Sequence, residues 1–204
     1  MRVIGKIVKE LKGRYIRRSV IHPKAYISAG STIYDSSIGE YSYCGYNCKI
    51  ISTDIGKYCS IADDVIIGGA AHPIDWVSTS PVFVKGKNCL GASLGNKPFS
   101  PYLKTTIGND VWIGDRAVLK SGISVGTGAV IGMSSVVTKD IPPYEIWAGN
   151  PAHKIRDRFS EDIKKQLIAS EWWNLKESEI ASYSVLIDDP KLFLETIKKR
   201  KGNI

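Results

Sequence analysis

The stretch that decides the fold is IGNDVWIGDRAVLKSGISVGTGAVIGMSSVV, residues 107–137, in which an aliphatic residue returns every six positions. Glycine follows four of these aliphatic residues, and the fifth position of each hexapeptide is small or β-branched. Helices repeat near 3.6 residues and ordinary strands near 2, so a sustained period of six fits neither. The period predicts a parallel β-helix of hexapeptide repeats. The aliphatic positions are Ile107, Ile113, Leu119, Val125, Ile131 and Val137, and the fifth positions are Val111, Ala117, Ile123, Ala129 and Ser135.

The same pattern runs through an earlier array, residues 21–67, with a five-residue step at each change of register. We expect its aliphatic side chains to fill a prism-shaped interior, with each coil pairing its backbone to the next at about 4.8 Å. Cys44, Cys48 and Cys59 fall in the interior columns, so we interpret them as small core residues rather than catalysts. The first positions are Ile21, Ile27, Ile33, Ile38, Cys44, Ile50, Ile55, Ile61 and Ile67.

Three segments depart from the repeat. Residues 1–19 form a basic N-terminal segment whose apolar spacing predicts a short helix, and residues 159–204 form a helical extension carrying Trp172-Trp173. We expect these tryptophans to pack against the β-helix or a neighbouring subunit. The β-helix domain, residues 20–158, is interrupted by an excursion loop at 70–104 with four prolines and no six-residue phase. A long irregular insertion with several aromatic residues predicts a functional loop.

Charge is unevenly distributed along the 204 residues. Residues 1–24 hold eight basic groups and one acidic group, which accounts for +7 of the net charge of +8. Two interpretations stay open for this segment: peripheral contact with an anionic membrane surface, or packing through its apolar stripe. No nucleic-acid-binding motif follows it, so we expect no nucleic-acid partner. The first twenty residues lack the apolar core of a signal peptide and no stretch is long enough to span a membrane, so we expect a cytoplasmic protein.

Four segments together resemble one family: IGKYCSI at 55–61, AHPIDWVSTSPVF at 71–83, IGNDVWIG at 107–114 and AGNPAHKIRDRF at 148–159. In this order they resemble the left-handed β-helix acyltransferases, within them the xenobiotic acetyltransferases and the related polysaccharide O-acetyltransferases. The resemblance implies a mainly β, left-handed parallel β-helix, a homotrimer with active sites between subunits, and acetyl-CoA as the donor.

The resemblance assigns the catalytic base to His72 in the loop. An imidazole titrating near neutrality can remove the proton of an acceptor hydroxyl as that oxygen attacks the thioester. Asp75 is a candidate for orienting the ring, although aspartate in a loop often caps a turn instead. A covalent route would require a thiolate beside His72, and Cys89 is the one cysteine outside the repeats. We favour direct transfer.

For the donor, the resemblance implies that residues 148–159 lie beside the nucleotide end of CoA. Lys154, Arg156 and Arg158 supply charge for the phosphates, and Asn150 and Pro151 shape the turn. We expect the pantetheine arm to run along the backbone near Gly114, Ser134 and the ring of Trp112. Trp112 has an equal alternative as an outward-facing residue buried against another subunit.

The acceptor is open among several chemistries. Tyrosines and small polar residues in the first array, with Tyr41, Tyr43 and Trp76 as the candidate contacts, favour a sugar or polysaccharide hydroxyl. The alternatives are O-acetylation of chloramphenicol or a streptogramin, N-acetylation of an amino sugar, and a scaffold without catalytic activity. The γ-type carbonic anhydrases, which share this fold, need three histidines at a metal site, whereas His72 is alone in its region. We therefore expect no metal.

Overall fold

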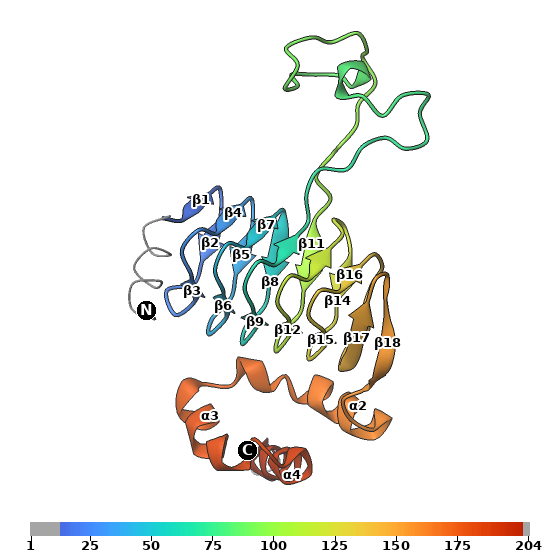
Figure 1. The fold of residues 1–204 in the computed structure, drawn as a ribbon. Helices are drawn as coiled ribbons and strands as arrows, with labels where there is room; N and C mark the ends of the chain where they lie inside the picture. The colour runs from blue at the N-terminus through green and yellow to red at the C-terminus, as the bar shows by residue number, and fades with distance from the viewer. Residues whose placement is uncertain (1–12, 202–204) are drawn as a thin grey trace, which may run out of the picture.

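The computed structural model describes residues 13–201, which form a parallel β-helix with an arm leaving one corner and helices along one side (Figure 1). Each coil contributes one short strand to each of three sheets. The first sheet contains β1 (Tyr15–Arg17), β4 (Thr32–Tyr34), β7 (Lys49–Ile51), β10 (Ile66–Ile67), β13 (Val118–Leu119) and β16 (Val136–Val137). The second contains β2 (Val20–Ile21), β5 (Ser37–Ile38), β8 (Thr53–Ile55), β11 (Thr105–Ile107) and β14 (Ser124–Val125). The third contains β3 (Tyr26–Ile27), β6 (Tyr43–Cys44), β9 (Ser60–Ile61), β12 (Trp112–Ile113), β15 (Val130–Ile131), β17 (Glu145–Gly149) and β18 (Ala152–Asp157).

The coils have two lengths, and the five-residue steps explain the difference. In the first array, stacked residues are 17 apart in sequence, and in the second they are 18 apart. The shortened corner lies between the first and second sheets, where Asp35 and Ser52 take positive φ values of 51° and 48°. Residues on either side of the insertion stack 52 apart in the same registers. The insertion therefore replaces one corner without disturbing the stack.

The periodic positions form the core, as the sequence predicts. All six aliphatic positions of residues 107–137 are at most 3% exposed, and every fifth position between them is buried. Cys44, Cys48 and Cys59 are buried in the same cluster, which confirms their interpretation as core residues. The interior is a single hydrophobic column along the coils.

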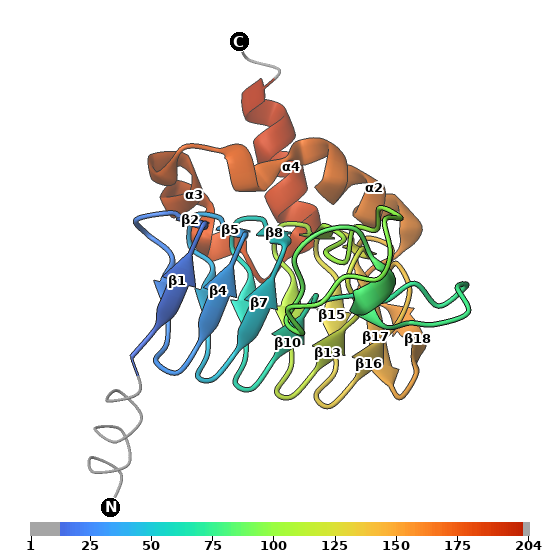
Figure 2. The same cartoon turned by 90° about the horizontal axis from the view of Figure 1, so that it is seen from above.

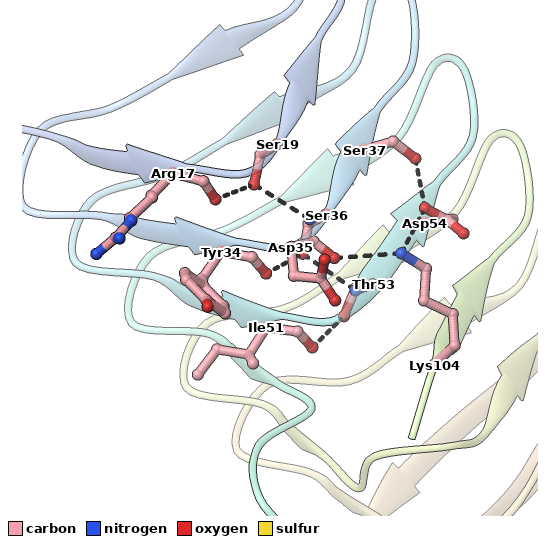
Figure 3. A network of polar contacts seen from close by, with 10 residues as sticks. All are labelled: Arg17, Ser19, Tyr34, Asp35, Ser36, Ser37, Ile51, Thr53, Asp54 and Lys104. Atoms are coloured by element: carbon pink, nitrogen blue, oxygen red, sulfur yellow. Dashed lines mark hydrogen bonds and ion pairs between the residues drawn. The ribbon is translucent and has the colours of Figure 1, made fainter. Parts of the chain in front are cut away.

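A column of hydroxyl groups links consecutive coils at the corner between the first and second sheets (Figure 3). The Ser36 hydroxyl donates to the carbonyl of Tyr34 at 2.8 Å and accepts the N–H of Thr53 at 3.0 Å. The Thr53 hydroxyl donates to the carbonyl of Ile51 at 2.9 Å, and the Ser19 hydroxyl accepts the N–H of Ser36 at 3.1 Å. On sequence alone, the small polar residues of the first array, Ser36 among them, counted toward a sugar acceptor. The structure shows that the side chains of this column satisfy backbone groups that a tight corner leaves unpaired.

The insertion between β10 and β11 forms an arm that leaves the coils on the side away from the C-terminal helices (Figure 1). At its base, Lys104 Nζ lies 3.0 Å from Asp54 Oδ1 and donates to the carbonyl of Asp35 at 3.2 Å (Figure 3). Further out, the arm contains one turn of 3₁₀ helix, η1 (Pro81–Phe83), and an edge-to-face pair of Trp76 with Phe99 at 6.1 Å. These contacts give a segment without hexapeptide phase a defined shape.

The C-terminal segment lies along one side of the β-helix (Figure 2). It contains α2 (Glu161–Ser170), η2 (Trp172–Asn174), α3 (Glu177–Tyr183), η3 (Ser184–Leu186) and α4 (Pro190–Lys201). Trp172 lies 5.1 Å from the ring of Tyr58 and packs edge-to-face on Phe193. Trp173 is buried, and its carbonyl accepts a hydrogen bond from Lys57. The expected packing of the tryptophan pair on the β-helix is thus confirmed.

Two expectations concern the remaining parts of the chain. Most of the helix expected within residues 1–19 lies outside the described residues, and within them β1 begins at Tyr15. Within residues 13–201 no helix combines the length and the apolar character needed to cross a membrane.

We predict that Thr53→Val lowers the free energy of unfolding by about 1–2 kcal/mol, because valine keeps the shape but removes the donor to the carbonyl of Ile51. Thr53 is fully buried, so water cannot replace that donor. Urea denaturation monitored by circular dichroism measures the change. Thr106→Val, at an exposed threonine of β11, is the control and should change stability far less. Equal losses in both variants would contradict the assigned role of the hydroxyl column.

Candidate functional site

His72 lies near the base of the arm, and one hydrogen bond fixes its protonation pattern. Its Nδ1 is 2.9 Å from the carbonyl oxygen of Thr79. A carbonyl can only accept, so Nδ1 must carry a hydrogen, and in the neutral ring Nε2 then holds the lone pair. The ring is exposed, so Nε2 is available to an incoming hydroxyl group. His72 is therefore arranged as a proton acceptor.

The orienting group differs from the sequence expectation. Asp75 is exposed, and within residues 13–201 no hydrogen bond or ion pair joins it to His72. The backbone carbonyl of Thr79, seven residues further along the loop, contacts the ring instead. Sequence reasoning missed Thr79 because a carbonyl carries no residue-type signal.

A cavity of about 540 Å³ opens beside His72 within the arm. Its wall includes Phe99 and Tyr102 as aromatic surfaces and Lys85, Lys87 and Cys89 as groups with polar ends. Cys89 is exposed and lines the same cavity as His72. A cavity with one aromatic wall, one imidazole and several polar groups fits a hydroxylated small molecule or the end of a polymer.

A second concave region lies on the outer face of the third sheet. It is a groove of about 360 Å³ whose lining includes Trp112, Val130, Ile146 and Arg156. The strand register explains this gathering, since Trp112 pairs with Val130, Val130 with Ile146, and Ile146 with Arg156. Trp112 is 55% exposed, so its ring is a free apolar surface in this single chain.

The three cations expected at the phosphates have different roles. Lys154 Nζ lies 2.8 Å from Glu145 and 2.9 Å from Asp157, and these carboxylates raise its pKa. Arg158 pairs with Asp110 at 3.0 Å and donates to the carbonyl of Gly128. Arg156 is exposed, and its guanidinium donates to the carbonyl of Asp157 without forming an ion pair within the described residues. Arg156 is thus the cation with the most charge left for an anionic ligand.

The other residues expected beside CoA lie near the same end of the coils. They are Gly114, Ser134, Asn150 and Pro151. A Cβ on Gly114 would come 2.6 Å from the nitrogen of Met133, so only glycine allows the coils to stack there. Ser134 takes a φ of 57° at the next coil, and the peptide bond between Asn150 and Pro151 is cis. The structure therefore places Gly114 and Ser134 on adjacent coils, and the Asn150–Pro151 turn between β17 and β18.

The three residues expected at the acceptor do not come together. Trp76 lies in the arm, whereas Tyr43 is exposed on the outer face of the third sheet. Tyr41 accepts a hydrogen bond from Lys24 and stacks on Tyr58 at 5.3 Å, in the seam against the C-terminal helices. Packing within the chain thus occupies Tyr41.

The cavity and the groove are separate in one chain, and none of the residues 13–201 lines both. The arm leaves the corner between the first and second sheets (Figure 1). The groove is lined by residues on strands of the third sheet. No group of three His, Cys, Asp or Glu side chains in residues 13–201 is arranged to hold a metal ion.

Comparisons with known proteins agree on one family. The family described as "Bacterial transferase hexapeptide (six repeats)" matches residues 104–139. A chloramphenicol acetyltransferase of Klebsiella aerogenes is 44% identical over 59% of this chain and 58% of its own length, so the chain spans little more than half of that relative. A probable macrolide acetyltransferase of Lysinibacillus sphaericus is 39% identical over 72% of this chain and 80% of its own.

Two further similarities involve carbohydrates. The galactoside O-acetyltransferase of Escherichia coli K12 is 31% identical over 76% of this chain and 69% of its own length. Among solved structures, the polySia specific acetyltransferase NeuO is 27% identical with a TM-score of 0.52, over 79% of this chain and 73% of its own.

We predict that Arg158→Gln destabilises the chain by about 1–2 kcal/mol at neutral pH, because it leaves the half-buried Asp110 carboxylate without its cation. Burial already raises the pKa of Asp110, and loss of Arg158 should raise it further. Protonation of Asp110 removes the unpaired charge, so the difference from wild type should shrink as pH falls toward that pKa. Urea titrations from pH 7 to pH 4 measure this. Arg156→Gln is the control, and a pH-independent difference for Arg158→Gln would contradict the argument.

Proposed function

This chain belongs to the hexapeptide-repeat acetyltransferases, and we propose that it transfers the acetyl group of acetyl-CoA to a hydroxyl group of a sugar or polysaccharide. The observation that carries the proposal is the His72 ring, held by the Thr79 carbonyl with Nε2 free at the cavity of the arm. A base in this arrangement suits direct transfer between two bound substrates.

In the proposed reaction, Nε2 of His72 takes the proton of the acceptor hydroxyl as its oxygen attacks the thioester carbonyl of acetyl-CoA. The tetrahedral intermediate then collapses, the carbon–sulfur bond breaks, and the imidazolium returns the proton to the CoA sulfur. Nδ1–H keeps its hydrogen bond to Thr79 throughout, which stabilises the imidazolium between the two proton transfers. The products are the acetyl ester and free CoA.

On the donor side, the groove of the third sheet offers what CoA requires. Trp112 supplies an apolar face for the pantetheine arm or the adenine, and Arg156 supplies charge for a phosphate. Lys154 and Arg158 hold the wall of this region through Glu145 and Asp110.

We further propose a homotrimer in which the arm of one subunit reaches the groove of its neighbour. The separation of cavity and groove within one chain supports this arrangement, because direct transfer requires the base and the thioester in one site. An assembly of identical subunits around a closed axis gives every subunit the same environment.

A second acceptor class has specific support. The chloramphenicol acetyltransferase of Klebsiella aerogenes has the higher sequence identity, whereas the galactoside O-acetyltransferase and NeuO support a sugar. Release of the CoA thiol from acetyl-CoA, measured with chloramphenicol and with a panel of sugars and glycans, distinguishes the two. Fast turnover of chloramphenicol with none on any carbohydrate would overturn the sugar proposal.

We predict that His72→Ala lowers kcat about 10²- to 10⁴-fold while the affinity for acetyl-CoA stays nearly unchanged. Thiol release gives kcat, and calorimetric titration gives the affinity. His22→Ala is the matched control, since His22 lies in the first coils and only accepts the N–H of Lys24. Near-normal turnover of His72→Ala would remove His72 from the reaction.

We predict that Arg156→Ala raises the KM for acetyl-CoA by about 5- to 20-fold at low salt, with a smaller effect at high salt. Steady-state kinetics at two ionic strengths measure this effect. At limiting acetyl-CoA and low salt, mixed trimers refolded from His72→Ala and Arg156→Ala subunits should have a higher kcat/KM than either parent, because some sites then receive an intact His72 from one subunit and an intact Arg156 from another. Failure of the mixture to exceed either parent would contradict sites shared between subunits.

A further inference from the structure

The arm that forms the cavity beside His72 carries more positive than negative side chains. Residues 70–104 contain four lysines and a single carboxylate, that of Asp75. Lys104 is engaged at the base of the arm, and Lys97 lies over the ring of Trp76 at 5.7 Å. Lys85 and Lys87 are the two that line the cavity with His72.

Neither of these two lysines is neutralised within the chain. In the described part of the protein, neither forms an ion pair or a side-chain hydrogen bond, and both are exposed. Asp75 does not line the cavity. The cavity therefore presents two uncompensated positive charges to whatever occupies it.

The backbone that carries the lysines is held in place from both sides. The N–H of Lys85 donates to the carbonyl of Lys97 at 2.8 Å, across the bridge between Val84 and Lys97. The Asn88 side chain donates to the carbonyls of Pro81 and Ala92 and accepts the N–H of Leu90. Gly86, between the lysines, has a φ of 114°, which a residue with a side chain rarely adopts. These contacts hold the backbone of the turn, so Lys85 and Lys87 both start from a defined position in the arm that carries His72.

From this arrangement we infer that the acceptor is anionic: a sugar or glycan carrying a carboxylate, which Lys85 and Lys87 bind while a nearby hydroxyl meets His72. The inference rests on the proposed function and names its substrate class. Ammonium groups recognise a carboxylate as point charges, so they would attract and orient the acceptor without taking part in proton transfer. Lys85 and Lys87 are thus specificity-determining residues.

The test compares acceptors that differ only in charge. Oligomers of galacturonic acid and of sialic acid are each paired with their methyl esters, which keep the hydroxyl groups but lose the carboxylate charge. We expect wild type to acetylate at least one of the acids with a kcat/KM about tenfold or more above that of its ester at low salt, with the preference shrinking at high salt. The double variant Lys85→Gln/Lys87→Gln should raise the KM for that acid about tenfold and leave kcat and the ester kinetics nearly unchanged.

Lys165→Gln is the control, because it removes one lysine charge from an exposed position on α2, away from the arm (Figure 1). It should retain the preference for the acid. Equal or better turnover of the esters by wild type, or acetylation of chloramphenicol or a neutral sugar alone, would overturn the inference and leave acetyl transfer intact. An unchanged preference in the lysine double variant would overturn it as well. Absence of transfer from acetyl-CoA to every acceptor would instead overturn the proposed function, and this inference with it.

Discussion

Backbone hydrogen bonds between consecutive coils are the constraint on which the rest of the structure depends. The N–H of Trp112 donates to the carbonyl of Ala129 one coil further, and the N–H of Gly114 does the same to Ile131. Because every strand has a partner above or below it, a coil cannot change its path without disturbing its neighbours. Close stacking also explains the glycine columns: a Cβ on Gly39 would come 2.6 Å from the carbonyl oxygen of Gly56. The same stacking limits the interior to one aliphatic side chain per strand.

The stacked coils differ from one another mainly at the corners between sheets, and each corner carries a different kind of residue. Between the first and second sheets, hydroxyl groups replace the backbone partners lost in the shortened turn, and the arm leaves from this corner. Between the second and third sheets, Tyr41 and Tyr58 form an aromatic seam that receives Trp172. Where the third sheet returns to the first, the buried Gly114 lets consecutive coils approach closely. A uniform core thus supports local differences that carry function.

The chemistry is divided in the same way. His72, the proposed base, belongs to the arm, whose shape depends on its own contacts, while the groove belongs to the face of the third sheet. A change in the long insertion can therefore alter the cavity without altering the groove proposed for CoA, since the arm contacts the coils at its base. Lys85 and Lys87 illustrate this freedom, because they line the cavity and lie outside the stacked coils.

The sequence by itself determined the repeat, the interior columns and the interruption of the coils at residues 70–104. These features depend on local sequence. A period of six with an aliphatic first position buries those side chains together when the chain coils into a β-helix, and an insertion without that period cannot join the stack. Resemblance in four short segments also pointed to His72 and to the cations near residue 156. Only the tertiary structure decided which groups meet. The carbonyl of Thr79 contacts the His72 ring where Asp75 was expected, and Tyr41 stacks on Tyr58 in the seam against the C-terminal helices. Lys154 and Arg158 are neutralised by carboxylates, whereas Arg156 and the two arm lysines keep their charge. The reason is physical: a backbone carbonyl has no residue-type signature, and whether a charge is free depends on partners brought close by folding rather than by sequence.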